Sequence, residues 1–414
     1  MRSPSTDTET DAGAAIASSS SAASGRGFIL LLVAVAAVSP LGINIYLPSM
    51  PGMAADFGVD FAAIQLTLSL YLLTVAIGQL FIGPLSDRYG RRPVLLAGLA
   101  AFVLGSLLCL IAADIGLLLA GRVLQAVGGC AGITLSRAVV RDLYGREQAA
   151  SMIGYVTMGM AVAPMLAPSI GGALDGVYGW QASFVFLLLF SALTLAGVLL
   201  RLPETNRHCG PTGAIGQMLR GYAKLGGSRL FWGYALTTAF NSAVFFSFVA
   251  GASYVVVELM GRTPLEYGIY FGAVSLGYIL GNFFTARRAT TIGPNRLILA
   301  GSFMVLGSVA VMAAAFGLGY MHPVALFMPM FFVGVGNGMV MPSGVAGAIS
   351  VRPEAAGTAA GLSGSLQMGC GALTAPLVGA LLGGGSIWPM IGVMAAWALL
   401  GIAAFALVGR AAGP

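Results

Sequence analysis

Charge is scarce in this sequence. Only 8% of its 414 residues are Asp, Glu, Lys or Arg, and 58% are hydrophobic. Soluble proteins carry about 25% charged residues. A soluble protein of this length could not cover its surface with so few charges. The composition excludes a cytosolic enzyme and a nucleic-acid-binding protein, and it predicts an all-α integral membrane protein.

Patterns that bind metals or nucleotides are also missing. The sequence has four cysteines and two histidines, with no CxxC pair and no cysteine near a histidine, so it predicts neither a metal site nor a disulfide framework. No GxxxxGK[ST] motif occurs, which argues against ATP-driven pumping. We therefore expect no catalytic residues, no metal and no bound cofactor.

Twelve apolar segments follow one another, each near the length of about 20 residues that crosses a bilayer core. Residues 1–26 are rich in Ser, Thr and Ala and predict a disordered tail. We expect a six-helix bundle over 27–202, a polar middle loop over 203–228 and a second six-helix bundle over 229–410. The predicted spans are 28–48, 65–86, 94–113, 115–138, 149–173, 181–201, 230–257, 266–286, 296–318, 323–349, 355–382 and 387–409.

Basic residues gather in alternate loops, which predicts the orientation of the chain. If both termini are cytoplasmic, nearly all Lys and Arg of the loops and tails lie inside, and Arg262 alone lies in an outer loop. This distribution follows the positive-inside rule. The outer side instead collects acids, namely Asp56, Asp60, Asp114, Asp175, Glu258 and Glu266.

The two halves of the sequence repeat. An Ala-Pro-x-x-Gly pattern at 167–171 recurs at 375–379, and Trp180 recurs at the same offset as Trp388. A third match, in the third and ninth spans, has a nearly equal offset. Parallel six-span repeats place a substrate site near the bilayer midplane between the halves. The geometry allows alternating access by rocking of the halves.

The loop between spans 2 and 3 reads Gly-Pro-Leu-Ser-Asp-Arg-Tyr-Gly-Arg-Arg-Pro. It resembles the signature loop of the major facilitator superfamily, in which the aspartate faces the start of span 11, here near Pro353 and Glu354. The resemblance implies a cytoplasmic latch that breaks when the cavity opens inward; the alternative is a topology anchor with a tight turn. Its residues are Gly83, Asp87, Arg88, Gly90, Arg91 and Arg92.

Span 4 contains an arginine well inside its apolar run, in the segment Gly-Arg-Val-Leu-Gln. Arg122 and Gln125 share one helix face. A charge at the bilayer centre costs roughly 2.5–3.5 kcal/mol on insertion scales, so Arg122 should not face lipid. The segment resembles the arginine motif of drug:proton antiporters, which implies a role for Arg122 in proton transfer. The alternative is an arginine that snorkels to the outer surface.

Span 5 carries two prolines and a glycine pair, Pro164, Pro168, Gly171 and Gly172. Such a helix bends and packs closely against a neighbour. It resembles the antiporter motif of exporters, with Ala167 before the second proline as in the bicyclomycin-resistance (Bcr/CflA) type. The alternative is a kinked packing helix without a role in export.

Span 1 departs from that subfamily. Asn44 stands just before the Tyr-Leu-Pro segment, where the resemblance leads us to expect an aspartate. Asparagine binds by hydrogen bonds but exchanges no proton near pH 7. We expect Asn44, Tyr71, Arg122 and Gln125 to form a polar substrate or coupling cluster; for Asn44 the alternative is a helix–helix hydrogen bond. In the second half, Asn241 and Phe245 are candidate cavity residues, together with Tyr254, Tyr278, Asn282 and Asn337.

The resemblance implies a monomeric twelve-span transporter of a bacterial cytoplasmic membrane, embedded in the lipid bilayer and not an enzyme. It would export small amphipathic drugs by alternating access, with the proton as coupling ion. An exporter of one endogenous metabolite, such as an amino acid, peptide or siderophore, is the alternative. A membrane receptor that transports nothing is a third possibility, against which the gating loop and the repeat both argue.

Overall fold

The computed structural model describes residues 26–144, 146–206, 221–352 and 355–411. In this part of the chain twelve helices are long and apolar enough to cross a membrane, and every regular element is helical. The twelve predicted spans are therefore confirmed. The predicted tail, apart from Arg26, and most of the middle loop lie outside the described residues, so the predicted domain boundaries there stay predictions.

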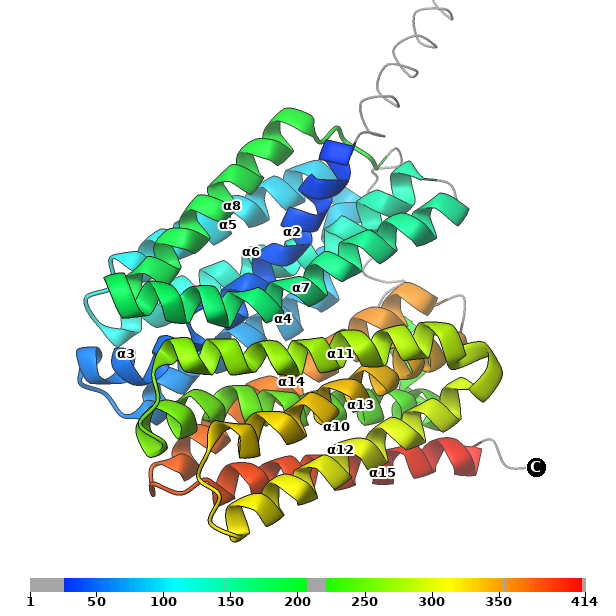
Figure 1. Cartoon of the computed structure of the whole chain (residues 1–414). Helices are drawn as coiled ribbons and strands as arrows, with labels where there is room; N and C mark the ends of the chain where they lie inside the picture. The colour runs from blue at the N-terminus through cyan, green and yellow to red at the C-terminus, as the bar shows by residue number, and fades with distance from the viewer. Residues whose placement is uncertain (1–25, 145, 207–220, 353–354, 412–414) are drawn as a thin grey trace, which may run out of the picture.

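The helices follow the chain in two sets (Figure 1). The first set comprises α2 (Arg26–Asn44), η1 (Leu47–Ser49), α3 (Met50–Phe57), α4 (Phe61–Tyr89), α5 (Arg91–Leu110), α6 (Ile115–Leu143), α7 (Arg146–Tyr178) and α8 (Gln181–Arg201). The second set comprises α10 (Arg229–Tyr254), the π-helical turn η2 (Val255–Leu259), α11 (Pro264–Ile292), α12 (Pro294–Gly317), α13 (Pro323–Ser350), α14 (Ala356–Leu382) and α15 (Trp388–Ala411).

Several helix boundaries follow from local chemistry. Asp114 accepts a hydrogen bond from the Leu117 amide and caps α6, because the first amides of a helix lack partners within it. Thr263 and Glu266 form a capping box that starts α11. Gly90, with φ of 99°, separates α4 from α5 in a backbone conformation that side chains disfavour.

The two sets form two halves, each packed around its own helices. The halves meet along two helix pairs, α4 with α14 and α7 with α11. The repeated Ala-Pro-x-x-Gly pattern lies in α7 and in α14, so each copy of the duplicated sequence contributes to one of these two contacts. The internal repeat is thus the source of the paired interface.

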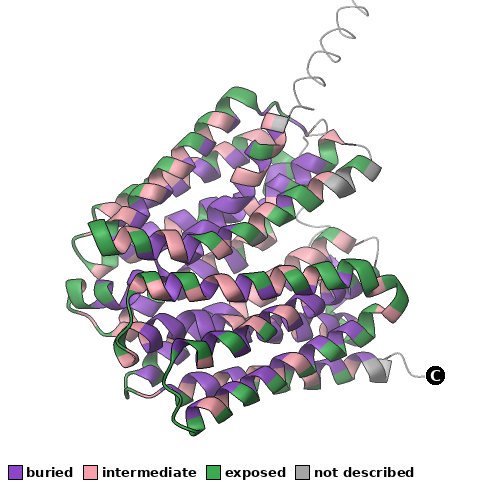
Figure 2. Ribbon diagram, viewed as in Figure 1, coloured by how far each residue is buried: buried purple, intermediate pink, exposed green. Residues whose placement is uncertain are grey.

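The outward faces of the helices are apolar. Buried residues concentrate inside each half, while exposed residues follow the outer faces (Figure 2). In α8 the exposed face carries Leu189, Leu193 and Leu200, the last 84% exposed. Such a surface is costly in water but suits contact with lipid chains. It agrees with a chain embedded in a bilayer.

The halves touch at one end and diverge toward the other (Figure 1). We call the end that holds the α4–α5 loop and the C-terminus the basic end, after Arg88, Arg91 and Arg92. We call the end that holds α3 the acidic end, after Asp56 and Asp175. The molecule is closed at its acidic end and hollowed at its basic end, as the contacts below establish.

Candidate functional site

The acidic end is sealed by backbone contact between α7 and α11. The Ser169 hydroxyl donates a 2.8 Å hydrogen bond to the Gly268 carbonyl of the other half. A Cβ added at Gly268 would collide with the Pro168 carbonyl, and one added at Gly172 would collide with the Pro264 carbonyl. The halves approach this closely only because both positions are glycine. The proline–glycine motif of span 5 therefore lies at the contact between the halves.

A second contact seals the same region between α4 and the other half. The Ser69 hydroxyl donates to the Ala372 carbonyl of α14 at 2.5 Å. The Gln65 side-chain amide donates to the Ala250 carbonyl of α10. Both hydrogen bonds are accepted by backbone carbonyls, so they depend on the position of the opposite helix and not on the identity of its side chains.

Arg122 is fully buried in α6 and holds α2 and α6 together. Its Nη1 donates to the Gly42 carbonyl at 2.9 Å and to Gln125 Oε1 at 2.6 Å. Gln125 in turn donates to Ser106 of α5 at 2.8 Å. The alternative of an arginine that snorkels to the surface is wrong, because Arg122 has no exposed area.

Two tyrosine rings enclose the guanidinium. Its carbon lies 4.3 Å from the ring centroid of Tyr46 and 4.5 Å from that of Tyr71, both within the range of cation–π attraction. The Tyr46 hydroxyl bonds Thr67 and the Tyr71 hydroxyl bonds Ser39, which fixes the rings. Among the described residues no carboxylate pairs with Arg122, and its Nε and Nη2 have no hydrogen-bond partner. The guanidinium charge is therefore stabilised by the dipoles of neutral groups and by two aromatic rings, without a carboxylate partner among the described residues.

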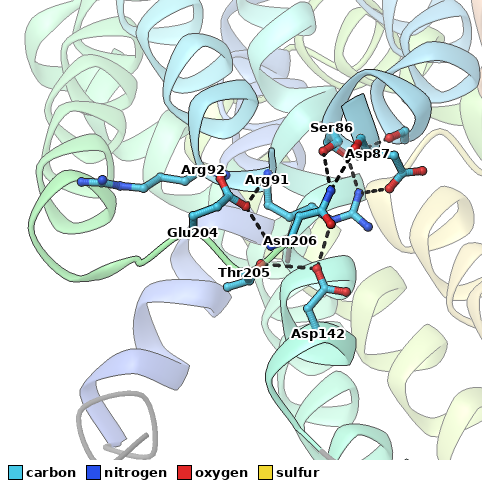
Figure 3. Close-up of polar contacts among 9 residues, drawn as sticks. Ser86, Asp87, Arg91, Arg92, Asp142, Glu204, Thr205 and Asn206 are labelled. Atoms are coloured by element: carbon cyan, nitrogen blue, oxygen red, sulfur yellow. Dashed lines mark hydrogen bonds and ion pairs between the residues drawn. The ribbon is translucent and has the colours of Figure 1, made fainter. Parts of the chain in front are cut away.

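At the basic end, Arg91 joins the ends of two helices (Figure 3). Its Nη1 lies 2.6 Å from Asp87 Oδ1 of α4, and its Nε lies 3.0 Å from Asp142 Oδ2 of α6. Its Nη1 also donates to the Ser86 hydroxyl. The α4–α5 loop is thereby fixed to its own half.

Glu204 fixes the other side of this loop (Figure 3). Its carboxylate accepts the backbone amides of Arg91 at 2.9 Å and Arg92 at 3.1 Å, where the positive end of the α5 dipole favours an anion. A Cβ at Gly90 would occupy the space that Glu204 takes. Gly90 therefore serves both the turn and the approach of this carboxylate.

Glu204→Gln is expected to lower the thermal stability of the protein in detergent. The change removes the charge at the α5 N-terminus, an interaction of about 0.3–1 kcal/mol at an exposed site such as Glu204. Asp60→Asn is the matched control, because Asp60 precedes α4 without a side-chain capping bond. Equal melting midpoints for Glu204→Gln and the control would show that Glu204 does not stabilise the loop.

A cavity of about 690 Å³ opens at the basic end between the two halves. Its volume falls within the range of about 300–1,000 Å³ typical of small-molecule sites. One wall comes from the ends of α4 and α6 and the other from the first turns of α14. Charged and polar residues of its lining include Gln79, Asp87, Arg91, Thr134, Arg137, Arg141, Tyr222, Lys224 and Thr358.

A family model, that of the Major Facilitator Superfamily, matches residues 32–374. The chain belongs to the major facilitator superfamily. Multidrug resistance protein D of Escherichia coli (strain K12) is 33% identical over 81% of this chain and 84% of its own length. The bicyclomycin resistance protein homolog of Haemophilus influenzae is 30% identical over 88% and 92%. A crystal structure of the peptide transporter POT, at 16% identity, covers 92% of this chain and 94% of its own with a TM-score of 0.75, which confirms the fold.

This major facilitator brings together part of the predicted polar cluster. Tyr71, Arg122 and Gln125 lie in contact, as above. Asn44 donates instead to the Pro40 carbonyl of its own helix at 2.7 Å, and its Oδ1 has no partner among the described residues. The recorded bond is thus within α2 and not between helices.

The two predicted residues of the second half lie apart from Arg122. Asn241 is buried inside that half, where it donates to Thr237 and to Ser302 of α12. Phe245 is half-buried and packs against Phe271 of α11 with ring centroids 6.3 Å apart. Neither lines the cavity at the basic end.

The latch predicted for this major facilitator stays a prediction, because only one of its two sides is described. Asp87 lines the cavity and pairs with Arg91 on its own half, while Gly357 and Thr358 of α14 line the same cavity. Pro353 and Glu354, the predicted start of span 11, lie outside the described residues; α14 begins at Ala356.

Sequence reasoning missed four groups of this site. Nothing in the sequence spacing of Tyr46, Asp142 and Glu204 indicates what they bind. The Gly42 carbonyl has no signal in sequence, since any residue carries a carbonyl. Only the packing of α2 on α6 brings it to Arg122.

Proposed function

We propose that this major facilitator exports small amphipathic molecules across the cytoplasmic membrane by alternating access, as a monomer and in exchange for protons. Relatives named for drug resistance match most of the chain. The observation that carries the proposal is the cavity, which opens at the basic end while glycine contacts close the acidic end. A transporter in this state can load a molecule from one side only.

The basic end faces the cytoplasm in this proposal, because positive residues stay on that side. Engineered cysteines at Arg262 and Gly176, at the acidic end, should react with an impermeant thiol reagent in intact cells. A cysteine at Arg288 should react only after the membrane is permeabilised. Labelling of Arg288→Cys alone in intact cells would reverse the proposed orientation.

Proton coupling needs a group that releases a proton, and Arg122 cannot supply it. Guanidinium stays protonated at any physiological pH. The acids that the structure describes all lie near helix ends or in loops. Coupling would therefore run through these end groups, such as Asp175 at the acidic end and Asp87 at the basic end. Arg122 would act as a fixed charge that links α2, α5 and α6.

The export proposal is tested in efflux-deficient cells that express the protein from a plasmid. The panel should include bicyclomycin, a phenicol, an intercalating dye and the anionic amphiphile fusidic acid, with and without an uncoupler. We expect lower accumulation of at least one compound, reversed by the uncoupler. Arg122→Gln at matched membrane abundance is the control. If cells with the unmodified protein accumulate every compound to the same level as cells with the control, drug export is refuted. Export of an endogenous metabolite would then be the remaining proposal.

A further inference from the structure

A second arginine of α6 faces the cavity. Arg137 is exposed there, and its Nη2 lies 3.6 Å from the Met160 sulfur of α7. Met160 lies about 21 Å along α7 from Arg146 at 1.5 Å per residue. The guanidinium thus reaches well inside the molecule.

The charges of the cavity do not balance. Asp87 and Arg91 pair with each other. The other charged residues of the described lining are Arg137, Arg141 and Lys224, and none of them pairs with a carboxylate in the described part of the chain. The recorded hydrogen-bond acceptor of Arg137 is a thioether, which is a weak one.

Membrane topology accounts for only part of this excess. The positive-inside rule explains basic residues at the level of the headgroups, such as Arg141 and Lys224. It does not explain a guanidinium held against the middle of α7. Unpaired positive charge in a cleft bounded by low-dielectric protein focuses the potential, so it repels cations and concentrates anions. Arginine also matches a carboxylate in bidentate geometry.

We propose that the cavity selects anionic amphipathic substrates, whose carboxylate binds Arg137. Arg141 and Lys224 line the same cavity and attract the anion toward it. Leu80 and Ile133 line the same cavity and supply apolar contact for the rest of the molecule. Arg122 is enclosed by its own half and does not take part in this step. This substrate class rests on the proposed export function.

Binding to the purified full-length protein tests the proposal. The probes are fusidic acid, its methyl ester and ethidium, which present an anion, a neutral close analogue and a cation. Titration calorimetry should give an affinity at least tenfold higher for the acid than for the ester, and the weakest binding for ethidium. Arg137→Gln should remove the preference for the acid and leave ester affinity within twofold. Arg137→Lys should restore part of it.

Arg288→Gln is the matched control, because it removes an exposed arginine of the basic end outside the cavity lining. It should keep the full preference for the acid. Equal affinities for acid and ester in the unmodified protein, or an unchanged preference in Arg137→Gln, would overturn the proposal. If cells still export neutral or cationic drugs in that case, only the proposed anion selectivity is wrong and the export function is retained. If cells export none of the compounds, the proposed export function itself is refuted.

Discussion

Gly268→Val is expected to reduce transport at least tenfold while the protein remains folded in the membrane. The added side chain has no room in the closed state, since even a Cβ at Gly268 would meet the backbone of Pro168 and Ser169 in the other half. The acidic end can then no longer close. The equilibrium shifts toward the state that opens this end, and a loss of about 1.4 kcal/mol or more in closure corresponds to a tenfold change in population.

Gly272→Val is the matched control, one turn further along α11. A Cβ at Gly272 meets nothing within 4 Å, so the control carries the same change in helix propensity without the collision. Efflux rates are compared at equal membrane abundance. The rate should fall for Gly268→Val only. Equal rates for the two variants would show that the halves do not need this contact to close.

Arg122→Gln is expected to abolish transport, with a loss of a hundredfold or more, and to change stability little. Removing one partner of a buried ion pair costs about 3–5 kcal/mol, because the other charge is left uncompensated. Arg122 has no carboxylate partner among the described residues, so its loss leaves only the Gly42 carbonyl and Gln125 with weaker partners. We expect a stability change within about 2 kcal/mol.

Arg122→Lys separates charge from geometry. Lysine keeps the charge, but its compact ammonium cannot stack between the Tyr46 and Tyr71 rings as a planar guanidinium does. We expect it to transport less than a tenth as fast as the unmodified protein. Both variants are followed by thermal unfolding in detergent and by efflux. A variant that unfolds in proportion to its loss of transport would make Arg122 a structural residue only.

The sequence predicted the membrane-spanning helices well, but it predicted only some of the contacts between them. Apolar length fixes a membrane span whatever surrounds it, so all twelve were found. Gly171 and Gly172 could be predicted as packing positions, because a glycine pair beside prolines has few other uses in a span. The α7–α11 pairing could not, since it depends on how two halves with weak sequence similarity meet.

The polar cluster shows where such reasoning fails. Arg122 and Gln125 were paired through helical spacing alone, which holds within one helix. The sequence does not fix the direction of the Asn44 side chain, and its amide turns back to the Pro40 carbonyl of the same helix. The basic cavity escaped prediction for a related reason: Arg137 counts as a topology signal in the sequence, and only the structure shows its guanidinium against α7.

The central claim, that the two ends open alternately, is tested most directly by paired spin-label distances in reconstituted protein. One pair, at Ala55 and Leu265, spans the halves at the acidic end; the other, at Tyr89 and Arg288, spans them at the basic end. All four positions are exposed. We predict reciprocal changes: conditions that shorten the Tyr89–Arg288 distance lengthen the Ala55–Leu265 distance, and Gly268→Val favours that second state. Two distances that stay fixed, or that lengthen together, under every substrate and pH condition would contradict alternating access.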